Sequence, residues 1–179
     1  MSSNIVPLKL RPHLVSFLMK EMSGQECDFA GYRCKVFELS KYSTIGQFIL
    51  DNLRKIDYPV KDIKRFNFFC DIKAVSRRRY IAQGKFYKIE TLGRSFVELP
   101  EEYVAMVNDL FEQQFRSVFF GYVSCKADTD ENISKAIIRF IDKYDLYEAG
   151  ISDVALRKLY YRIKESGVLS PLQGKLSRK

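Results

Sequence analysis

The spacing of apolar residues changes at Pro100, and this change limits what the chain can fold into. Before Pro100 apolar residues tend to alternate with polar ones, as from Phe66 to Ile72, which is typical of strands. After Pro100 they recur every third or fourth residue, which is typical of helices. Because 46% of the 179 residues are hydrophobic, the chain can bury a core. The sequence therefore predicts an α+β protein with a strand-rich first half and a helical second half.

The first half is predicted to contain a helix, a β-hairpin, a second helix and antiparallel strands. The expected ranges are 11–23 for the helix, 25–39 for the hairpin, 43–55 for the second helix, and 65–75, 79–92 and 96–99 for the strands. A turn at Ala30-Gly31 would place Asp28 opposite Arg33, which favours this register by charge. It would also place Cys27 opposite Cys34 at a hydrogen-bonded position, whose wide spacing suits packing better than a disulfide.

Capping residues indicate where the helices begin. Thr44 and Gln47 have the spacing of a capping box at the start of the second helix. Asp130 and Ser152 are expected to cap the last two helices, and Gly167 to end the final one. The long helix that follows Pro100 is expected to continue to about residue 124.

Three regions follow from these elements. Residues 1–99 form a mixed α/β region with a basic hairpin, residues 100–167 form a helical region, and residues 168–179 form a flexible basic tail. Because the connections between them are short, we expect one fused domain.

Charge is distributed unevenly along the chain. Residues 1–100 carry 18 Lys and Arg against 10 Asp and Glu, a net charge of +8, and residues 101–150 carry 5 against 10, a net charge of −5. Residues 151–179 carry 7 against 2, a net charge of +5. With a total of +8 and a pI of about 9.3, the chain is expected to favour polyanionic partners.

The sequence shows no signal for membranes, secretion or cofactors. No apolar run approaches the roughly 20 residues that span a bilayer, and no secretory signal opens the chain, so we expect a cytoplasmic protein. The four cysteines, Cys27, Cys34, Cys70 and Cys125, lack metal-ligand spacing and are predicted to be reduced thiols. No glycine-rich phosphate loop is present, and we expect neither a metal, a cofactor nor a small-molecule ligand.

Residues 141–166 contain the strongest functional pattern, a candidate helix-turn-helix. The turn Gly150-Ile151-Ser152 resembles that of many bacterial helix-turn-helix regulators, and Leu156 and Leu159 follow at the spacing that this motif uses for packing. Leu146 departs from the motif, which favours a small residue where the two helices touch. The polar face expected to contact DNA comprises Arg157, Lys158, Tyr161, Arg162 and Lys164, with Asp153 beside them. The alternative is an ordinary helix hairpin with a solvated basic face.

A second candidate for DNA binding lies in the basic hairpin. Between residues 61 and 94 the chain has 10 basic and 3 acidic side chains. Five of the basic residues are predicted to contact phosphates: Arg77, Arg78, Arg79, Lys85 and Lys88. The aromatic residues interleaved with the basic residues of 61–94 offer faces for stacking on single strands, but at alternate positions they are more typical of a core. These aromatic residues are Phe66, Phe68, Phe69, Phe86 and Tyr87.

Catalysis is not expected. His13 is the single histidine and is interpreted as a surface or capping residue. With only one histidine, Ser-His and Cys-His catalysis and metal sites with His ligands are poorly supported. Asp71-Ile72-Lys73 has the D-x-K form of one class of metal-dependent nucleases, with Asp51, Asp57 or Asp62 as the further carboxylate. That nuclease is an alternative to the non-enzymatic interpretation.

The sequence therefore predicts a non-enzymatic DNA-binding protein, a regulator or accessory factor of a bacterial or mobile genetic element. It would contact DNA by its basic C-terminal helix and its basic hairpin. The competing hypothesis is an interaction or assembly protein, such as a phage structural protein, whose basic surface meets an acidic protein partner. A homodimer is compatible with either function, because the helix after Pro100 has apolar residues to spare.

Overall fold

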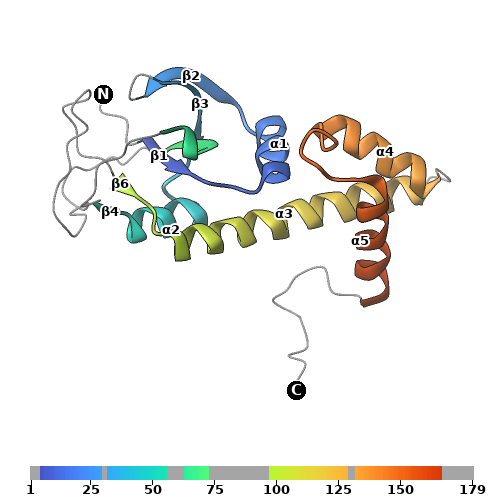
Figure 1. Cartoon of the computed structure of the whole chain (residues 1–179). Coiled ribbons are helices and arrows are strands. Elements are labelled where there is room, and N and C mark those ends of the chain that lie inside the picture. The colour runs from blue at the N-terminus through green and yellow to red at the C-terminus, as the bar shows by residue number, and fades with distance from the viewer. Residues whose placement is uncertain (1–4, 30–31, 56–62, 73–96, 129–131, 167–179) are drawn as a thin grey trace. The chain divides into compact units, whose positions relative to one another are not determined.

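The computed structural model describes residues 5–29, 32–55, 63–72, 97–128 and 132–166, and it confirms the α+β class (Figure 1). The elements in chain order are β1 (Ile5–Leu8), α1 (Pro12–Glu21), β2 (Gly24–Phe29), β3 (Tyr32–Leu39), α2 (Thr44–Asn52), β4 (Arg54–Lys55), a 3-10 turn (Ile63–Arg65), β5 (Phe68–Ile72), β6 (Val97–Glu98), α3 (Glu101–Ala127), α4 (Ile133–Tyr144) and α5 (Asp153–Ser166).

The chain divides into two compact units. The first comprises residues 1–10 and 21–107, and the second comprises residues 11–20 and 108–179. The strands belong to the first unit, whereas α4, α5 and most of α1 and α3 belong to the second. The predicted strand at 79–92 lies outside the described residues.

The first unit is built around a mixed sheet with the strand order β1-β5-β3-β2. Neighbouring strands are antiparallel except β3 and β5, which are parallel and are joined through a crossover that contains α2. A second, two-stranded sheet pairs β4 with β6. The parallel pair corrects the expectation from the sequence that the strands are antiparallel.

The hairpin of β2 and β3 has the predicted register. Asp28 pairs with Arg33 and Cys27 with Cys34 across the two strands. The ion pair of Arg33, however, is made diagonally with Glu26. Both side chains of this ion pair are mostly exposed, so it contributes little to stability.

Strand β5 is buried on both faces. Phe68, Cys70 and Ile72 are fully buried, and Phe69, on the opposite face, is only 4% exposed. The alternating residues are buried as expected, and Phe69 between them is buried as well because β5 is an inner strand between β1 and β3. On one face Phe68 stacks on Phe37, with ring centroids 4.9 Å apart.

Two helix caps differ from those predicted. Ser43, not Thr44, caps α2, because the Ser43 hydroxyl accepts a hydrogen bond from the backbone N–H of Gly46 at 3.0 Å. Asn132 caps α4, since its side-chain oxygen accepts from the N–H of Ser134 at 2.8 Å. The predicted cap Asp130 lies outside the described residues. The second helix also ends at Asn52, where the chain becomes extended into β4.

The second unit has a core of aromatic rings contributed by α1, α3 and α4. Phe17, Phe115, Phe119 and Phe140 are almost completely buried, as is Tyr144. Neighbouring rings meet mostly edge-to-face or tilted at centroid distances between 4.6 and 5.9 Å. In the described part of the chain, no helix combines the length and the hydropathy that crossing a bilayer requires.

Candidate nucleic-acid interface

The connection between α4 and α5 is fixed by backbone and capping contacts. Asp145 ends α4 in the left-handed conformation, and the N–H of Leu146 donates to the carbonyl of Ile141. Gly150 has a positive φ of 80°, and the N–H of Ile151 donates to the carbonyl of Leu146. The Ser152 hydroxyl accepts from the N–H of Ala155 at 3.2 Å. Ser152 is therefore the cap of α5, as predicted.

This connection is longer than the tight turn of a helix-turn-helix. Helix α4 ends at Tyr144 and α5 begins at Asp153, whereas DNA-reading motifs usually have turns of about three or four residues. Leu146 lies after the end of α4 and is fully buried within the connection. Its size therefore does not obstruct a contact between the helices themselves.

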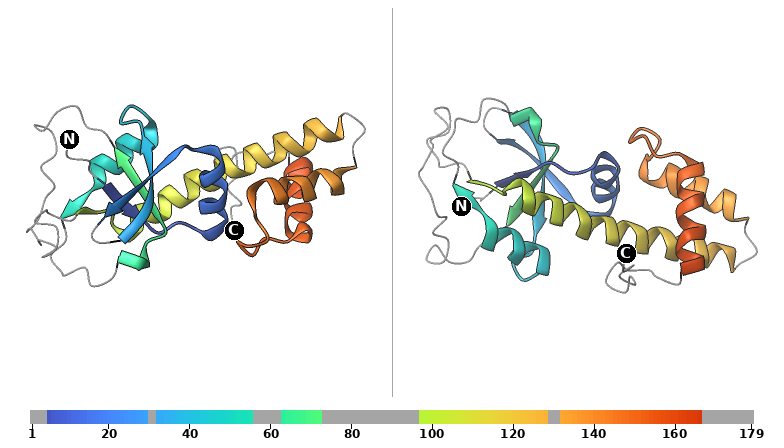
Figure 2. Two further views of the ribbon diagram at one scale, coloured as in Figure 1. Left: turned by 90° about the horizontal axis from the view of Figure 1, so that it is seen from above. Right: turned by 60° about the horizontal axis from the view of Figure 1, so that its bottom comes forward.

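Helix α5 buries its apolar side against the rest of the second unit. Leu156, Tyr160 and Ile163 are buried, and Leu159 is half-buried. The Tyr160 ring stacks on Phe120 of α3 at a centroid distance of 5.4 Å. Figure 2 shows α5, in red, beside α4 and the C-terminal end of α3. The predicted separation of α5 from α4, and the contact between them, are confirmed.

The opposite side of α5 presents the predicted polar face to solvent. All five residues named from the sequence are exposed: Arg157, Lys158, Tyr161, Arg162 and Lys164. The Arg157 guanidinium lies 3.7 Å from the Asp153 carboxylate, one turn earlier, and both side chains are more than a third exposed. Such a pair is weak in water, so Arg157 can exchange Asp153 for another anion at little cost.

Only part of the predicted basic hairpin lies within the described residues. Arg77, Arg78, Arg79, Lys85 and Lys88 all lie outside the described residues, as do Phe86 and Tyr87. The described aromatic residues Phe66, Phe68 and Phe69 are buried, which confirms the core interpretation for them. Beside them, the Arg65 guanidinium binds the Glu98 carboxylate at 2.8 Å and lies over the Phe66 ring.

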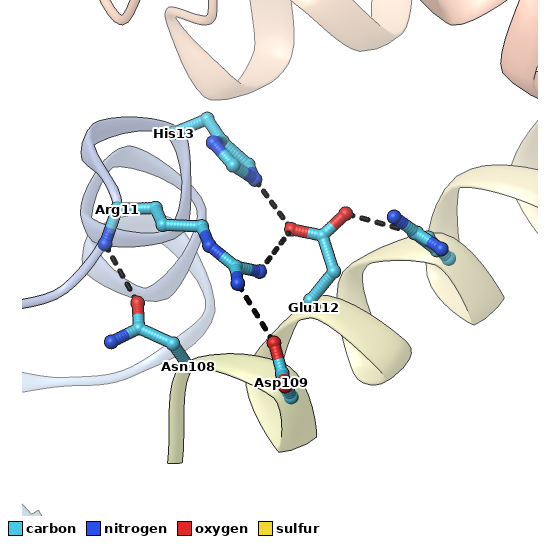
Figure 3. Close-up of polar contacts among 6 residues, drawn as sticks. Arg11, His13, Asn108, Asp109 and Glu112 are labelled. Carbon is cyan, nitrogen blue, oxygen red and sulfur yellow. Dashed lines mark hydrogen bonds and ion pairs between the residues drawn. The ribbon is translucent and has the colours of Figure 1, made fainter. Parts of the chain in front are cut away.

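A polar cluster in the second unit was not predicted (Figure 3). One carboxylate oxygen of Glu112 lies 2.8 Å from Nε2 of His13 and 3.4 Å from the guanidinium of Arg11, and the other accepts from Nε of Arg116 at 2.8 Å. Arg11 also binds the Asp109 carboxylate at 2.7 Å. Because an ionised carboxylate only accepts hydrogen bonds, the Nε2 of His13 carries the hydrogen.

The Glu112 carboxyl is held ionised by these partners. Burial raises the pKa of Glu112, but hydrogen bonds from His13 and Arg116 and the charge of Arg116 outweigh burial and lower this pKa to about 2. His13 is therefore neither a surface residue nor a cap, because its side chain is only 14% exposed and its ring meets Phe115 edge-on. Its contacts join α1 to α3 within the second unit.

Asn108 completes this junction at the start of α1. It is 7% exposed, and its side-chain oxygen accepts the backbone N–H of Arg11 at 2.8 Å (Figure 3). That N–H precedes the first turn of α1, where backbone donors have no partner within the helix. The cluster thus orients α1 on α3, and every contact in it is made within the chain.

The cysteines are free thiols, as predicted, and two of them are poorly suited to chemistry. Burial, with a smaller effect of the neighbouring Cys27, raises the pKa of Cys34 to about 12. Burial likewise raises the pKa of Cys70 to about 12. Thiols with such pKa values remain protonated near neutral pH and are weak nucleophiles and metal ligands.

The nuclease hypothesis is only partly covered by the structure. Asp71 lies on β5 and, with Glu26 and Glu38, is among the residues lining a cavity of about 930 Å³ in the first unit. Among the residues that the structure describes, no three His, Cys, Asp or Glu side chains are grouped so as to hold a metal ion. Asp57, Asp62 and Lys73 lie outside them, and Asp51 is exposed on α2. The nuclease interpretation stays an untested alternative.

Comparisons of the chain with models of protein families, with curated proteins and with solved structures give no match. The exposed face of α5 therefore provides the chemistry from which a function can be inferred.

Gly150 is expected to tolerate alanine poorly. No neighbouring atom would contact an added Cβ, but a φ of 80° is unfavourable for residues with a side chain. Gly150→Ala should lower the free energy of unfolding by about 1–2 kcal/mol, measured by urea denaturation, and Gly150→Asn by less, because asparagine adopts positive φ more readily. An alanine variant as stable as the parent would show that this conformation of the connection is wrong.

Proposed function

We propose that the protein binds DNA through the exposed basic face of α5, as a non-enzymatic regulator or accessory factor. The observation that supports this proposal is that Arg157, Lys158, Arg162 and Lys164 all reach solvent from one helix. The buried side of the same helix packs against the rest of the second unit, so the backbone that carries these cations is held in place. A fixed cationic helix is a suitable shape for a DNA groove.

The acidic residues of α5 do not cancel this charge. Asp153 and Glu165 are its only acids, against four basic residues, and Asp153 lies at the helix N-terminus beside Arg157. Net charge over the whole chain is +8, which also favours association with a polyanion. The setting that we propose, a bacterial or mobile genetic element, is the one expected from the sequence.

Removing two cations from α5 should weaken DNA binding and reduce its dependence on salt. If Lys158 and Arg162 each contact one phosphate, the double variant K158Q/R162Q should flatten the slope of log K against log salt by about 1.8 on duplex DNA. Fluorescence anisotropy with a labelled duplex, titrated over a range of salt concentrations, measures this slope.

The matched control removes the same charge from the other unit. Arg33 and Lys35 are both exposed on β3, so R33Q/K35Q has the same net charge as K158Q/R162Q. We expect the control to keep the parent's slope. If both double variants flatten the slope equally, the loss of net charge alone explains the change, and α5 is rejected as the interface. No binding of the parent to duplex or single-stranded DNA would favour an acidic protein partner instead.

A further inference from the structure

Helix α5 exposes two apolar side chains on the side that carries its basic residues. Val154 is 54% exposed and Tyr161 is 43% exposed. They are seven residues apart, which is about two helical turns, and therefore lie on the same side of α5, with Lys158 between them. Arg157 and Arg162 flank this stripe. Charge alone does not explain why an exposed valine lies beside the basic residues on this proposed phosphate-binding side of α5.

We infer that Val154 contacts the methyl group of a thymine in the major groove of duplex DNA. This inference rests on the proposed DNA binding and adds to it the kind of base that is read. Recognition helices contact base edges with their N-terminal residues, and Val154 lies in the first turn of α5. Valine has no hydrogen-bonding group, and the thymine methyl is the apolar group that the major groove presents.

The flanking residues fit the same placement. Lys158 and Arg162 lie on the same exposed side and can reach the phosphates beside the groove. Tyr161, farther along α5, can donate a hydrogen bond from its hydroxyl to a phosphate oxygen. A protein partner fits this surface less well, because a stable interface buries roughly 800 Å² on each side and has an apolar centre. On α5, two separated apolar side chains lie among charged residues instead, with Glu165 one turn after Tyr161.

The test removes the methyl group from the DNA and the valine from the protein. A duplex is first enriched from a random pool by binding to the full chain, and each thymine of the enriched sequence is then replaced in turn by uracil, which lacks only the methyl. At the contacted position, uracil should weaken binding by about fourfold, the effect of one buried methyl group. The variant V154A should bind the thymine and uracil duplexes equally.

The control is Ile138→Ala, which removes another exposed, branched side chain from the same unit, on α4. It should keep the fourfold preference for thymine. Salt-dependent binding of the parent with no uracil effect at any position would reject the role of Val154 and leave the proposed function intact, as would a V154A variant that keeps the preference. Failure to bind any duplex would reject both. A change in sedimentation of V154A without a change in DNA binding would assign this face to a second copy of the chain.

Discussion

Replacing Phe140 by alanine should remove about 3–5 kcal/mol from the free energy of unfolding. Phe140 is fully buried, and its ring lies 4.6 Å from Tyr144, 5.1 Å from Phe119, 5.5 Å from Tyr122 and 5.9 Å from Phe115, centroid to centroid. Four rings cannot all move inward to fill the space that the missing ring would leave. Since the total stability of a domain is about 5–15 kcal/mol, this loss is a substantial fraction of the free energy that keeps it folded.

Urea denaturation followed by circular dichroism measures this loss. Phe140→Leu retains most of the buried apolar volume and should cost less than half as much. Ile138→Ala, two residues earlier on α4, is the matched control, because Ile138 is 42% exposed and its truncation should change stability by no more than about 0.5 kcal/mol. Similar losses in F140A and I138A would contradict the burial of Phe140 among the four rings.

Local patterns in the sequence predicted the elements whose stability is local. The hairpin register followed from a two-residue turn and the charges of Asp28 and Arg33, which lie close together in the chain. The two sides of α5 followed from a period of 3.6, so that each residue named for the polar face is exposed. For the same reason, the start of α5 could be predicted from Ser152 and its hydroxyl.

Other features depend on residues that are far apart in the chain, and no local pattern marks them. The proline at position 7 argues against a strand, but β1 is an edge strand of its sheet and accepts it. The parallel pairing of β3 with β5 depends on a crossover and leaves no periodic signal. His13 meets Glu112 across 99 positions of sequence. In that cluster, a local signal existed only for Glu112 and Arg116, which are four residues apart on α3.

The candidate site was predicted in its basic residues and Tyr161, but no role was predicted for Val154. Arg157, Lys158, Arg162 and Lys164 are recognisable as a basic helix face from spacing alone. Val154 has the residue type of a core position, but the helical period places it opposite Leu156, and in the structure it is 54% exposed whereas Leu156 is buried. The residue type and the helical period therefore pointed to different environments for Val154, and the packing of the whole helix decided between them.

Acid should destabilise the protein through Glu112, over a range of pH that its pKa defines. The pKa of Glu112 is lowered from 4.5 to about 2 in the folded chain, so folding favours the ionised form. This contribution is complete above pH 4.5 and is lost as the pH falls towards 2. The shift corresponds to about 3 kcal/mol, and it needs little reduction for solvent because the side chain is only 14% exposed.

The variant Glu112→Gln tests this because it keeps the size of the side chain and removes the charge. Near pH 7, E112Q should be less stable than the parent by about 3 kcal/mol, because the side chains of His13 and Arg116 lose their ionised acceptor. As the pH is lowered from 5 to 2, the free energy of unfolding of the parent should fall towards that of the variant, and the difference between their urea midpoints should narrow. Glu165→Gln, on the exposed side of α5, removes one carboxylate at a solvated position and should follow the parent at every pH. A difference between E112Q and the parent that stays constant from pH 7 to pH 2 would mean that Glu112 acts by packing alone. In that case the carboxylate would not be what holds α1 on α3.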